Sequence, residues 1–235
     1  MMPERPGPGA GSVVAAELLK LRSLPAVSVT IATTAVLTGL LTLAVSASDG
    51  AAIPPLAVVA QVMQYGQIGV VLVGLLAATS EYDDRQIVTS LISVPQRLLL
   101  AGAKAIACVV AVTVASALTV AAAHLAVVNR FADTPGTDIA TGAVGSICYL
   151  TLLAMFGHGV GLLLRGTIPT LIVILLLAYV ASPLLGRVGD YLPGKAGSQL
   201  YQSTPTVGLS TVVLVAWAVA TLLAATTLFL RRDAA

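Results

Sequence analysis

The sequence predicts an all-α integral membrane protein with six transmembrane helices, on three observations. Of its 235 residues, 57% are hydrophobic and only 9% are charged, whereas an average soluble domain is about 25% charged. The mean hydropathy is +0.99, and apolar stretches long enough to cross a bilayer recur along the chain. These stretches are too long and too uniformly apolar for the alternating strands of a membrane barrel. The net charge of +2 indicates no binding of nucleic acid.

Each predicted span reaches the roughly 20 apolar residues that a helix needs to cross the hydrocarbon core. The spans cover residues 25–46, 56–79, 98–128, 139–164, 168–185 and 207–230. Cys108 and Cys148 lie inside spans without disulfide or metal spacing, so we interpret them as small apolar side chains. Residues 1–11 lack the apolar core of a signal peptide, so we expect the first span to stay in the mature chain. The predicted organisation is a cytoplasmic N-terminal region, 1–24, and a transmembrane domain, 25–232.

The distribution of lysine and arginine predicts the orientation, because cytoplasmic loops carry an excess of these residues. Nine of the twelve basic residues fall on one side of the predicted spans. The three on the other side are Arg130, Arg187 and Lys195. Both termini should therefore be cytoplasmic. The loops expected outside are residues 47–55, 129–138 and 186–206.

Residues 12–24 are predicted to form a short amphipathic helix in the cytoplasmic interface of the membrane. Its apolar stripe recurs at helical spacing, at Val14, Leu18, Leu21 and Pro25. Charged side chains flank that stripe, at Glu17, Lys20 and Arg22. A second interpretation, that this segment simply extends the first span, stays open.

A second amphipathic helix is predicted in the cytoplasmic segment 80–97, between the second and third spans. Ser80 followed three residues later by Asp83 has the spacing of a capping box, so the helix should begin at Ser80. Its apolar face is formed by Ile87, Val88, Leu91 and Ile92, and Pro95 marks its end. Its charged residues are Glu81, Asp83, Asp84, Arg85 and Arg97. This cluster indicates either a docking surface for a partner or a solvated loop that obeys the orientation rule.

Two segments carry a resemblance to a known family. The first is AELLKLRS at residues 16–23. The second runs from EYDDR at 81–85 through TSL at 89–91 and PQR at 95–97 to Lys104. In these patterns the chain resembles the membrane-spanning permease subunits of ABC exporters of the type-2 class. That class has six spans per subunit, an interfacial N-terminal helix and a cytoplasmic coupling helix between the second and third spans.

The resemblance implies a division of labour. A separate nucleotide-binding ATPase subunit would hold ATP and magnesium, and a second permease subunit, identical or different, would complete a dimer. This chain would then carry no cofactor, metal or catalytic residue of its own. The residues expected to couple it to the ATPase are Glu81, Tyr82, Asp83, Asp84 and Arg85. In that class the coupling segment usually begins with a Glu-Tyr head, here Glu81 and Tyr82, and continues with glycine. This chain instead continues with Asp83, Asp84 and Arg85.

Polar side chains inside the spans are the candidate pathway residues, because amides in lipid need polar partners. Gln61, Gln64 and Tyr65 share one face of the second span, with Gln67 nearby, and they line either a substrate path, a dimer seam or a packing interface. His124 and His158 lie on different spans at different depths, which favours hydrogen bonds between helices over a shared metal.

Three further segments bear on function. Residues 157–161, GHGVG, allow a close approach between helices. The external loop 186–206, with Tyr191, Leu192, Leu200 and Tyr201, is a candidate gate at the exit. Residues 189–196 nearly spell a phosphate-binding loop, but Ala196 replaces the hydroxyl residue that would hold magnesium.

Two other functions stay open beside the exporter permease. One is a non-transporting membrane partner of the immunity or sensory type. The other is a secondary carrier, which the lack of an acidic residue near the middle of any predicted span disfavours. The cargo stays open among lipid-like, drug-like, peptide and glycan molecules.

Overall fold

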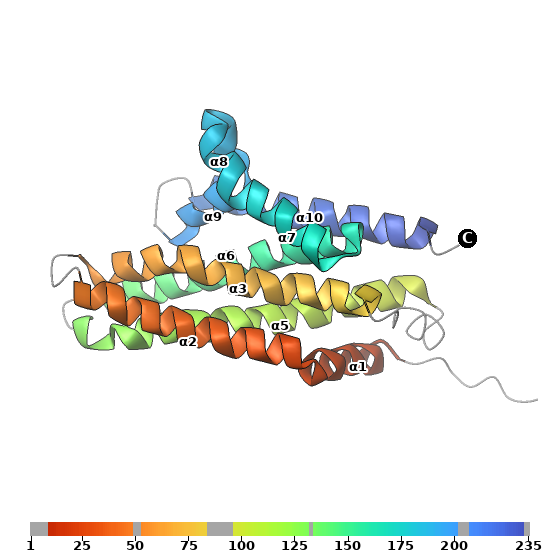
Figure 1. The fold of residues 1–235 in the computed structure, drawn as a ribbon, viewed down its shortest axis with the longest axis horizontal. Coiled ribbons are helices and arrows are strands. Elements are labelled where there is room, and N and C mark those ends of the chain that lie inside the picture. The colour runs from red at the N-terminus through yellow and green to blue at the C-terminus, as the bar shows by residue number, and fades with distance from the viewer. Residues whose placement is uncertain (1–8, 49–52, 84–95, 132–133, 202–206, 233–235) are drawn as a thin grey trace, which may run out of the picture.

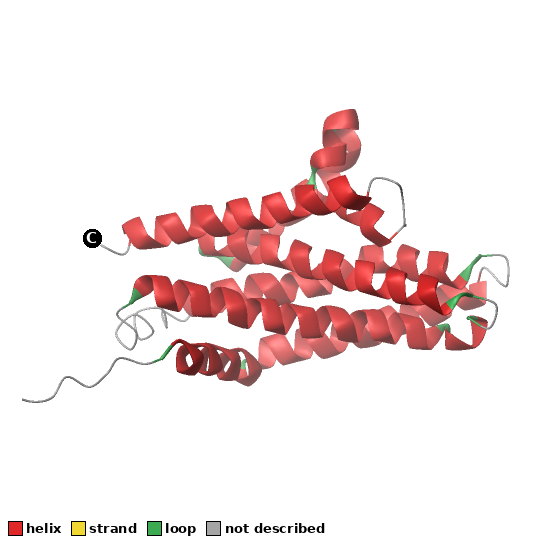
Figure 2. Ribbon diagram, turned by 180° about the vertical axis from the view of Figure 1, so that it is seen from behind, coloured by secondary structure: helices red, strands yellow, loops and turns green. Residues whose placement is uncertain are grey.

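The structure, a computed structural model, describes residues 9–48, 53–83, 96–131, 134–201 and 207–232. Every regular element in these ranges is a helix (Figure 2). The long helices lie side by side along one common axis (Figure 1). The predicted all-α class is therefore confirmed.

Within the described ranges, five helices are long and apolar enough to cross a membrane. They are α2 (Pro25–Ser48), α3 (Pro55–Asp83), α5 (Arg97–Ala126), α6 (Gly136–Leu164) and α10 (Val207–Arg232). They coincide, to within a few residues, with the first four and the last of the predicted spans. The chain is thus a multi-pass membrane protein.

The predicted span at 168–185 is a continuous run of helix of mixed type. It consists of α7 (Thr167–Leu175), a π-helical segment Leu176–Val180, and the short α8 (Ala181–Leu184). Pro183 has no N–H to donate to the carbonyl group of residue 179, which belongs to the π-helical segment. The wider turns of a π-helix accommodate this missing hydrogen bond. Figure 1 shows α8 leaning away from the bundle. A sixth membrane crossing stays a prediction.

Helices α3 and α6 form the centre of the bundle, and glycines bring them together. A Cβ atom on Gly74 of α3 would overlap the carbonyl group of Ala154 on α6, and one on Gly161 would meet Ala78. Gly159 instead faces Thr221 of α10. Lipid tails are as apolar as the helices, so close packing of small residues replaces the hydrophobic effect as the main source of cohesion. The predicted close approach at residues 157–161 is confirmed.

Helix α2 packs on α3 through a stripe of threonines. Thr34, Thr38 and Thr42 are buried along α2, opposite Gly66 and Gly69 of α3. The Thr34 hydroxyl donates to the Thr30 carbonyl at 2.6 Å, and that of Thr42 to the Thr38 carbonyl at 2.7 Å. Because each bond stays within α2, these hydroxyl groups can be buried without a partner on α3.

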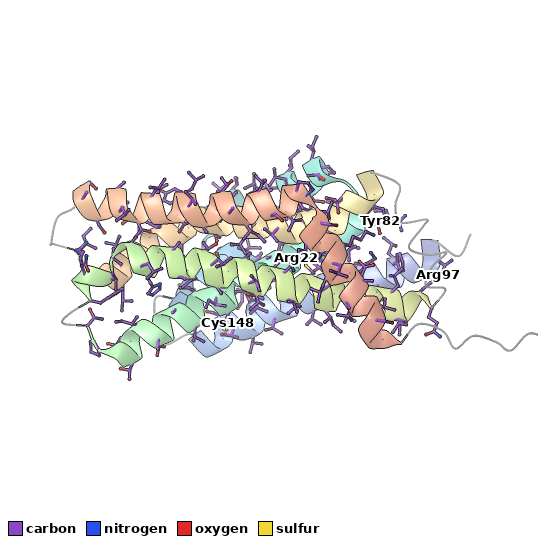
Figure 3. The ribbon with its side chains drawn as sticks, turned by 90° about the horizontal axis from the view of Figure 1, so that it is seen from below. Arg22, Tyr82, Arg97 and Cys148 are labelled. Atoms are coloured by element: carbon purple, nitrogen blue, oxygen red, sulfur yellow. The ribbon has the colours of Figure 1, made fainter. Side chains whose placement is uncertain are left out.

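Helix α1 (Ala10–Ser23) is separate from α2, because Leu24 is extended before Pro25. It crosses α5 obliquely (Figure 3) and packs on it, so α1 does not extend the first span. The predicted apolar stripe is confirmed in part: Leu21 is buried, and Val14 and Leu18 are half-buried. The buried stripe is Val13, Glu17 and Leu21, whereas Pro25 is exposed. Glu17 belongs to the buried stripe because it is an ion-pair partner rather than a flanking charge.

The helix predicted to begin at Ser80 does not begin there, because residues 80–83 form the last turn of α3. No glycine or proline lies between residues 75 and 94 to end α3 before this point. The rest of the predicted coupling helix, residues 84–95 with Asp84 and Arg85, lies outside the described residues. Helix α5 then begins at Arg97, with Gln96 as its N-cap.

The described part of the segment predicted to be external, residues 186–201, is mostly helical. It contains a 3-10 helix Gly186–Tyr191 and α9 (Pro193–Tyr201). Helix α9 packs on α6 and α10, and a Cβ atom on Gly197 would overlap the Tyr149 ring of α6. The Trp217 Nε1–H of α10 donates to the Tyr191 carbonyl at 2.9 Å. Residues 193–201 therefore lie against the bundle instead of extending into solvent.

Gly74→Ala should destabilise the protein, because its Cβ atom would force α3 away from α6. Overpacking of this kind costs about 1–3 kcal/mol, and we expect a lower melting temperature in detergent by circular dichroism. Gly102→Ala on α5 is the matched control, because its Cβ atom meets nothing within 4 Å. The control should melt at the wild-type temperature or higher. Equal melting of Gly74→Ala and wild type would contradict the packing of α3 on α6.

Candidate functional site

A polar cavity lies at the end of the bundle opposite the C-terminus (Figure 1), between the beginnings of α3 and α6 and the end of α5. Its volume is about 890 Å³. Six of its lining side chains are polar: Gln61, Gln64, His124, Asp138, Thr141 and Ser146. A cavity with this lining in a membrane-spanning bundle can hold water or a polar solute. We take it as the candidate site.

Helix α3 supplies the two glutamines of the site. Gln61 and Gln64 lie one turn apart, and both are exposed and line the cavity. Tyr65, predicted to share their face, is 58% exposed but is not among the described lining residues. At 3.6 residues per turn, Gln64 and Tyr65 point about 100° apart. The cavity lies on the side of Gln64, so only Gln61 and Gln64 of the predicted face line it.

Gln67 belongs to the core instead of the cavity. It is 6% exposed, and its Nε2 atom donates to the Gln64 carbonyl at 2.9 Å. The Tyr149 hydroxyl of α6 donates to its Oε1 atom. Gln67 therefore joins α3 to α6, which corresponds to the packing interpretation of this glutamine.

His124 brings an unused hydrogen-bonding atom to the cavity wall. Its Nδ1 atom lies 2.9 Å from the Val120 carbonyl oxygen of the same helix, and its ring stacks on Phe131 with centroids 5.8 Å apart. A proton on Nδ1 makes that bond and leaves Nε2 as an acceptor in the neutral ring. Among the described residues, the buried Nε2 atom has no hydrogen-bond partner. A donor group on a bound solute could satisfy it.

The ends of α5 and α6 complete the site, and sequence reasoning did not link their residues to Gln61 and Gln64. Asp138 lies in the first turn of α6, where the positive helix end favours a carboxylate. Arg130 braces this end, because its Nη2 donates to the Ile53 carbonyl at 2.6 Å. The predicted topology contained a signal for this link, because it places the beginnings of the second and fourth spans and the end of the third span on the same side of the membrane.

His158 has a structural environment. It is 1% exposed, and its Nδ1 atom lies 3.1 Å from the Gly74 carbonyl oxygen, across the α6–α3 interface. The predicted hydrogen bond between helices is therefore confirmed for His158, whereas His124 bonds within its own helix. No group of three or more metal-ligating side chains occurs among the described residues.

At the opposite end of the bundle, a buried ion pair holds α1 on α5. Lys104 Nζ lies 3.0 Å from Glu17 Oε2, and the two side chains are 11% and 12% exposed. Val13, Leu100 and Ala103 form an apolar cluster between the same helices. The two segments that carry the family resemblance thus meet through this pair, which the sequence analysis did not predict.

Tyr82 is the one predicted coupling residue whose side chain the structure describes. The Arg165 guanidinium lies 5.2 Å from its ring centroid, close enough for a cation–π contact. Arg165 has a left-handed backbone with φ of 53° and caps the end of α6. This contact joins the ends of α3 and α6. Glu81 and Asp83 belong to the last turn of α3, but their side chains lie outside the described part of the chain.

No protein-family model matches the chain, and no curated protein matches it in sequence.

A cysteine at position 64 should react with a membrane-impermeant thiol reagent, because the cavity admits water that ionises the thiol. In a background with Cys108→Ala and Cys148→Ser, we expect Gln64→Cys to react about tenfold faster than Gln67→Cys. Tyr65→Cys is the matched control for exposure to lipid, where the thiol stays protonated. Labelling of Tyr65→Cys as fast as Gln64→Cys would show that the cavity is not the water-accessible surface.

Loss of either charge at the α1–α5 contact should destabilise the protein, because the other charge stays buried. We expect Glu17→Gln or Lys104→Gln to cost about 3 kcal/mol, measured by thermal unfolding in detergent. The exchanged pair, Glu17→Lys with Lys104→Glu, should recover much of the loss. Asp190→Asn is the control, because the Asp190–Lys195 pair is about half exposed and should contribute little. Additive losses in the exchanged variant would contradict direct pairing.

Proposed function

We propose that this chain is the membrane-spanning permease subunit of an ATP-driven ABC exporter of the type-2 class. It forms the substrate pathway as a dimer and is coupled to a separate ATPase subunit that holds ATP and magnesium. The observation that carries this proposal is the polar cavity, joined by one unbroken helix to the segment with the Glu-Tyr head. The resemblance of residues 16–23 and 81–104 to that class supports the same assignment.

Helix α3 is the mechanical link in the proposal. It runs without a break from the cavity residues Gln61 and Gln64 to Tyr82. A rise of 1.5 Å per residue separates Gln61 from Tyr82 by about 30 Å, which equals the thickness of a bilayer core, about 30 Å. Because a helix is stiff along its axis, displacement of its Tyr82 end displaces the cavity wall. ATP hydrolysis on the partner can therefore change the shape of the cavity.

The acidic residues at the end of α3 support a basic partner. Glu81 and Asp83 lie in the last helical turn, where the negative end of the helix dipole disfavours carboxylates by about 0.3–1 kcal/mol each. A basic surface on the ATPase offsets that cost. Asp84 and Arg85 follow directly in the sequence, so the segment from Glu81 to Arg85 forms the contact in this proposal.

The proposed topology has six spans and both termini in the cytoplasm of a bacterial cell. Helices α7 and α8 then make the fifth crossing. Their exposed apolar side chains recur every fourth residue, at Ile168, Ile172, Leu176, Val180 and Leu184. Such a stripe faces lipid or the second subunit, and the dimer is proposed to cover part of it. Helix α1 lies in the cytoplasmic interface.

The polar cavity is the outer part of the substrate pathway in this proposal. Its glutamines, His124 and Asp138 offer donors and acceptors to the polar groups of a cargo molecule. Helix α9 lies against α6, which also forms part of the cavity wall. Movement of α6 relative to α9 would open the exit, so the segment 186–206 acts as the gate.

The affinity-tagged chain, extracted from its own cells in mild detergent, should co-purify with an ATP-hydrolysing subunit. We expect the double variant Glu81→Ala, Asp84→Ala to weaken docking about thirtyfold and so to reduce that recovery, because two charge-assisted contacts of about 1 kcal/mol each are lost. The measurement is ATPase activity and mass-spectrometric identity of the eluate.

Asp138→Ala is the matched control, because it removes an acid at the opposite end of the bundle and should leave recovery unchanged. The proposal is wrong if no ATPase co-purifies with the wild-type chain, which is the result expected for a sensory or immunity protein. It is also wrong if the purified chain alone moves a solute in vesicles, which is the result expected for a secondary carrier.

A further inference from the structure

A second cavity lies at the α1 end of the bundle, away from the polar cavity. It has a volume of about 390 Å³ and lies between the ends of α3, α6 and α10 and the beginning of α5. Most of its lining is aliphatic or aromatic, including Ala77, Leu98, Gly102, Leu222, Leu223 and Phe229. The volume falls within the range of ligand sites, about 300–1,000 Å³. Its apolar lining suits a hydrocarbon chain.

The cavity opens sideways toward lipid. Helix α10 packs mainly on α6 and α9 and touches α5 little, so the wall between α5 and α10 is incomplete. Leu98 and Leu223, which line the cavity from these two helices, are 67% and 61% exposed. Both helices are long and apolar enough to span the membrane. Lipid of the surrounding bilayer therefore has direct access to the cavity.

A cation with an unused donor lies next to this opening. Arg97 precedes Leu98 at the beginning of α5, and Figure 3 shows it near the end of α10. Its Nη1 atom is buried and has no hydrogen-bond partner among the described residues. Lys104, which also lines the cavity, is paired with Glu17. Among the side chains that the structure describes here, Arg97 therefore offers a positive charge to a ligand at this opening.

We infer that this cavity binds one acyl chain of an anionic phospholipid, with Arg97 binding the headgroup phosphate. The guanidinium group supplies paired donors that match phosphate oxygens. The acyl chain fills the space between α5 and α10, which adds packing contacts that a loose annular lipid would not make. The bound lipid thereby completes the weak contact between these two helices.

Two variants separate the headgroup contact from the acyl-chain contact. Arg97→Gln removes the charge and keeps the cavity. Gly102→Leu fills the cavity, and its Cβ atom meets nothing within 4 Å, so the fold should tolerate it. Arg22→Gln is the charge control, because Arg22 is an exposed cation on α1. Gly208→Leu is the size control on α10, where a Cβ atom is also unobstructed.

The measurement is native mass spectrometry of the full-length protein released from nanodiscs of equal parts dioleoyl phosphatidylglycerol and dioleoyl phosphatidylcholine. Wild type should retain one lipid and prefer phosphatidylglycerol, and Arg97→Gln should lower that preference about fivefold. Gly102→Leu should lose the retained lipid of either kind. Both controls should behave as wild type. Retention by Gly102→Leu at the wild-type level, or an unchanged preference in Arg97→Gln, would overturn the inference.

A photoreactive acyl chain independently locates the bound lipid in the wild-type protein. Phosphatidylglycerol with a diazirine near the end of one chain should label residues 98–105 and 222–229 in preference to the exposed face of α2. Even labelling of α2 and α5 would overturn the site. If Gly102→Leu changed the oligomeric state from dimer to monomer without loss of lipid, the cavity would bind a second copy of the chain. That result would also overturn the lipid site.

Discussion

The lack of hydrogen-bond partners in a bilayer core is the constraint on which the rest of this structure depends. Polar groups within the spans must find partners inside the protein, and the described spans show three ways of doing so. The threonines of α2 donate to carbonyls of their own helix. Gln67 and Tyr149 satisfy each other between α3 and α6. Glu17 and Lys104 neutralise each other where α1 meets α5.

The same constraint makes the remaining polar groups informative. His124 keeps a buried Nε2 atom without a partner among the described residues, and it lines a cavity with two glutamines and an aspartate. A buried cluster of polar side chains is costly unless water or a solute completes its hydrogen bonds. The buried Nε2 atom and the polar lining support the proposed role of the cavity in a transport pathway independently of the family resemblance.

Cohesion between the helices comes from small residues, and cavities occur where these contacts end. Glycines bring α3 against α2 and α6, and α6 against α10, but α5 and α10 share few contacts. The bundle is therefore rigid around α3 and α6 and open between α5 and α10. A rigid α3 suits a helix that carries motion from one side of the membrane to the other, and the opening suits a lipid.

Five of the six predicted spans could be derived from the sequence to within a few residues, because the length and apolarity of a span are local properties. Local signals were misleading at three places. The Ser80–Asp83 spacing fits a helix start, yet α3 continues through it. Glu17 reads as a surface charge, yet its partner on α5 places it in the buried stripe of α1. The predicted fifth span changes from α-helix to π-helix at Leu176–Val180, just before Pro183.

The sequence by itself determined the helical class, the five helices that are long and apolar enough to cross a membrane and the clustering of charge near residue 81. These follow from composition and periodicity, which act within one segment. Only the tertiary structure decided that Gln61 and Gln64 share a cavity with His124 and Asp138, that Gln67 does not, and that Glu17 meets Lys104. Contacts between segments depend on how helices rotate and approach one another, and that depends on side chains far apart in the sequence.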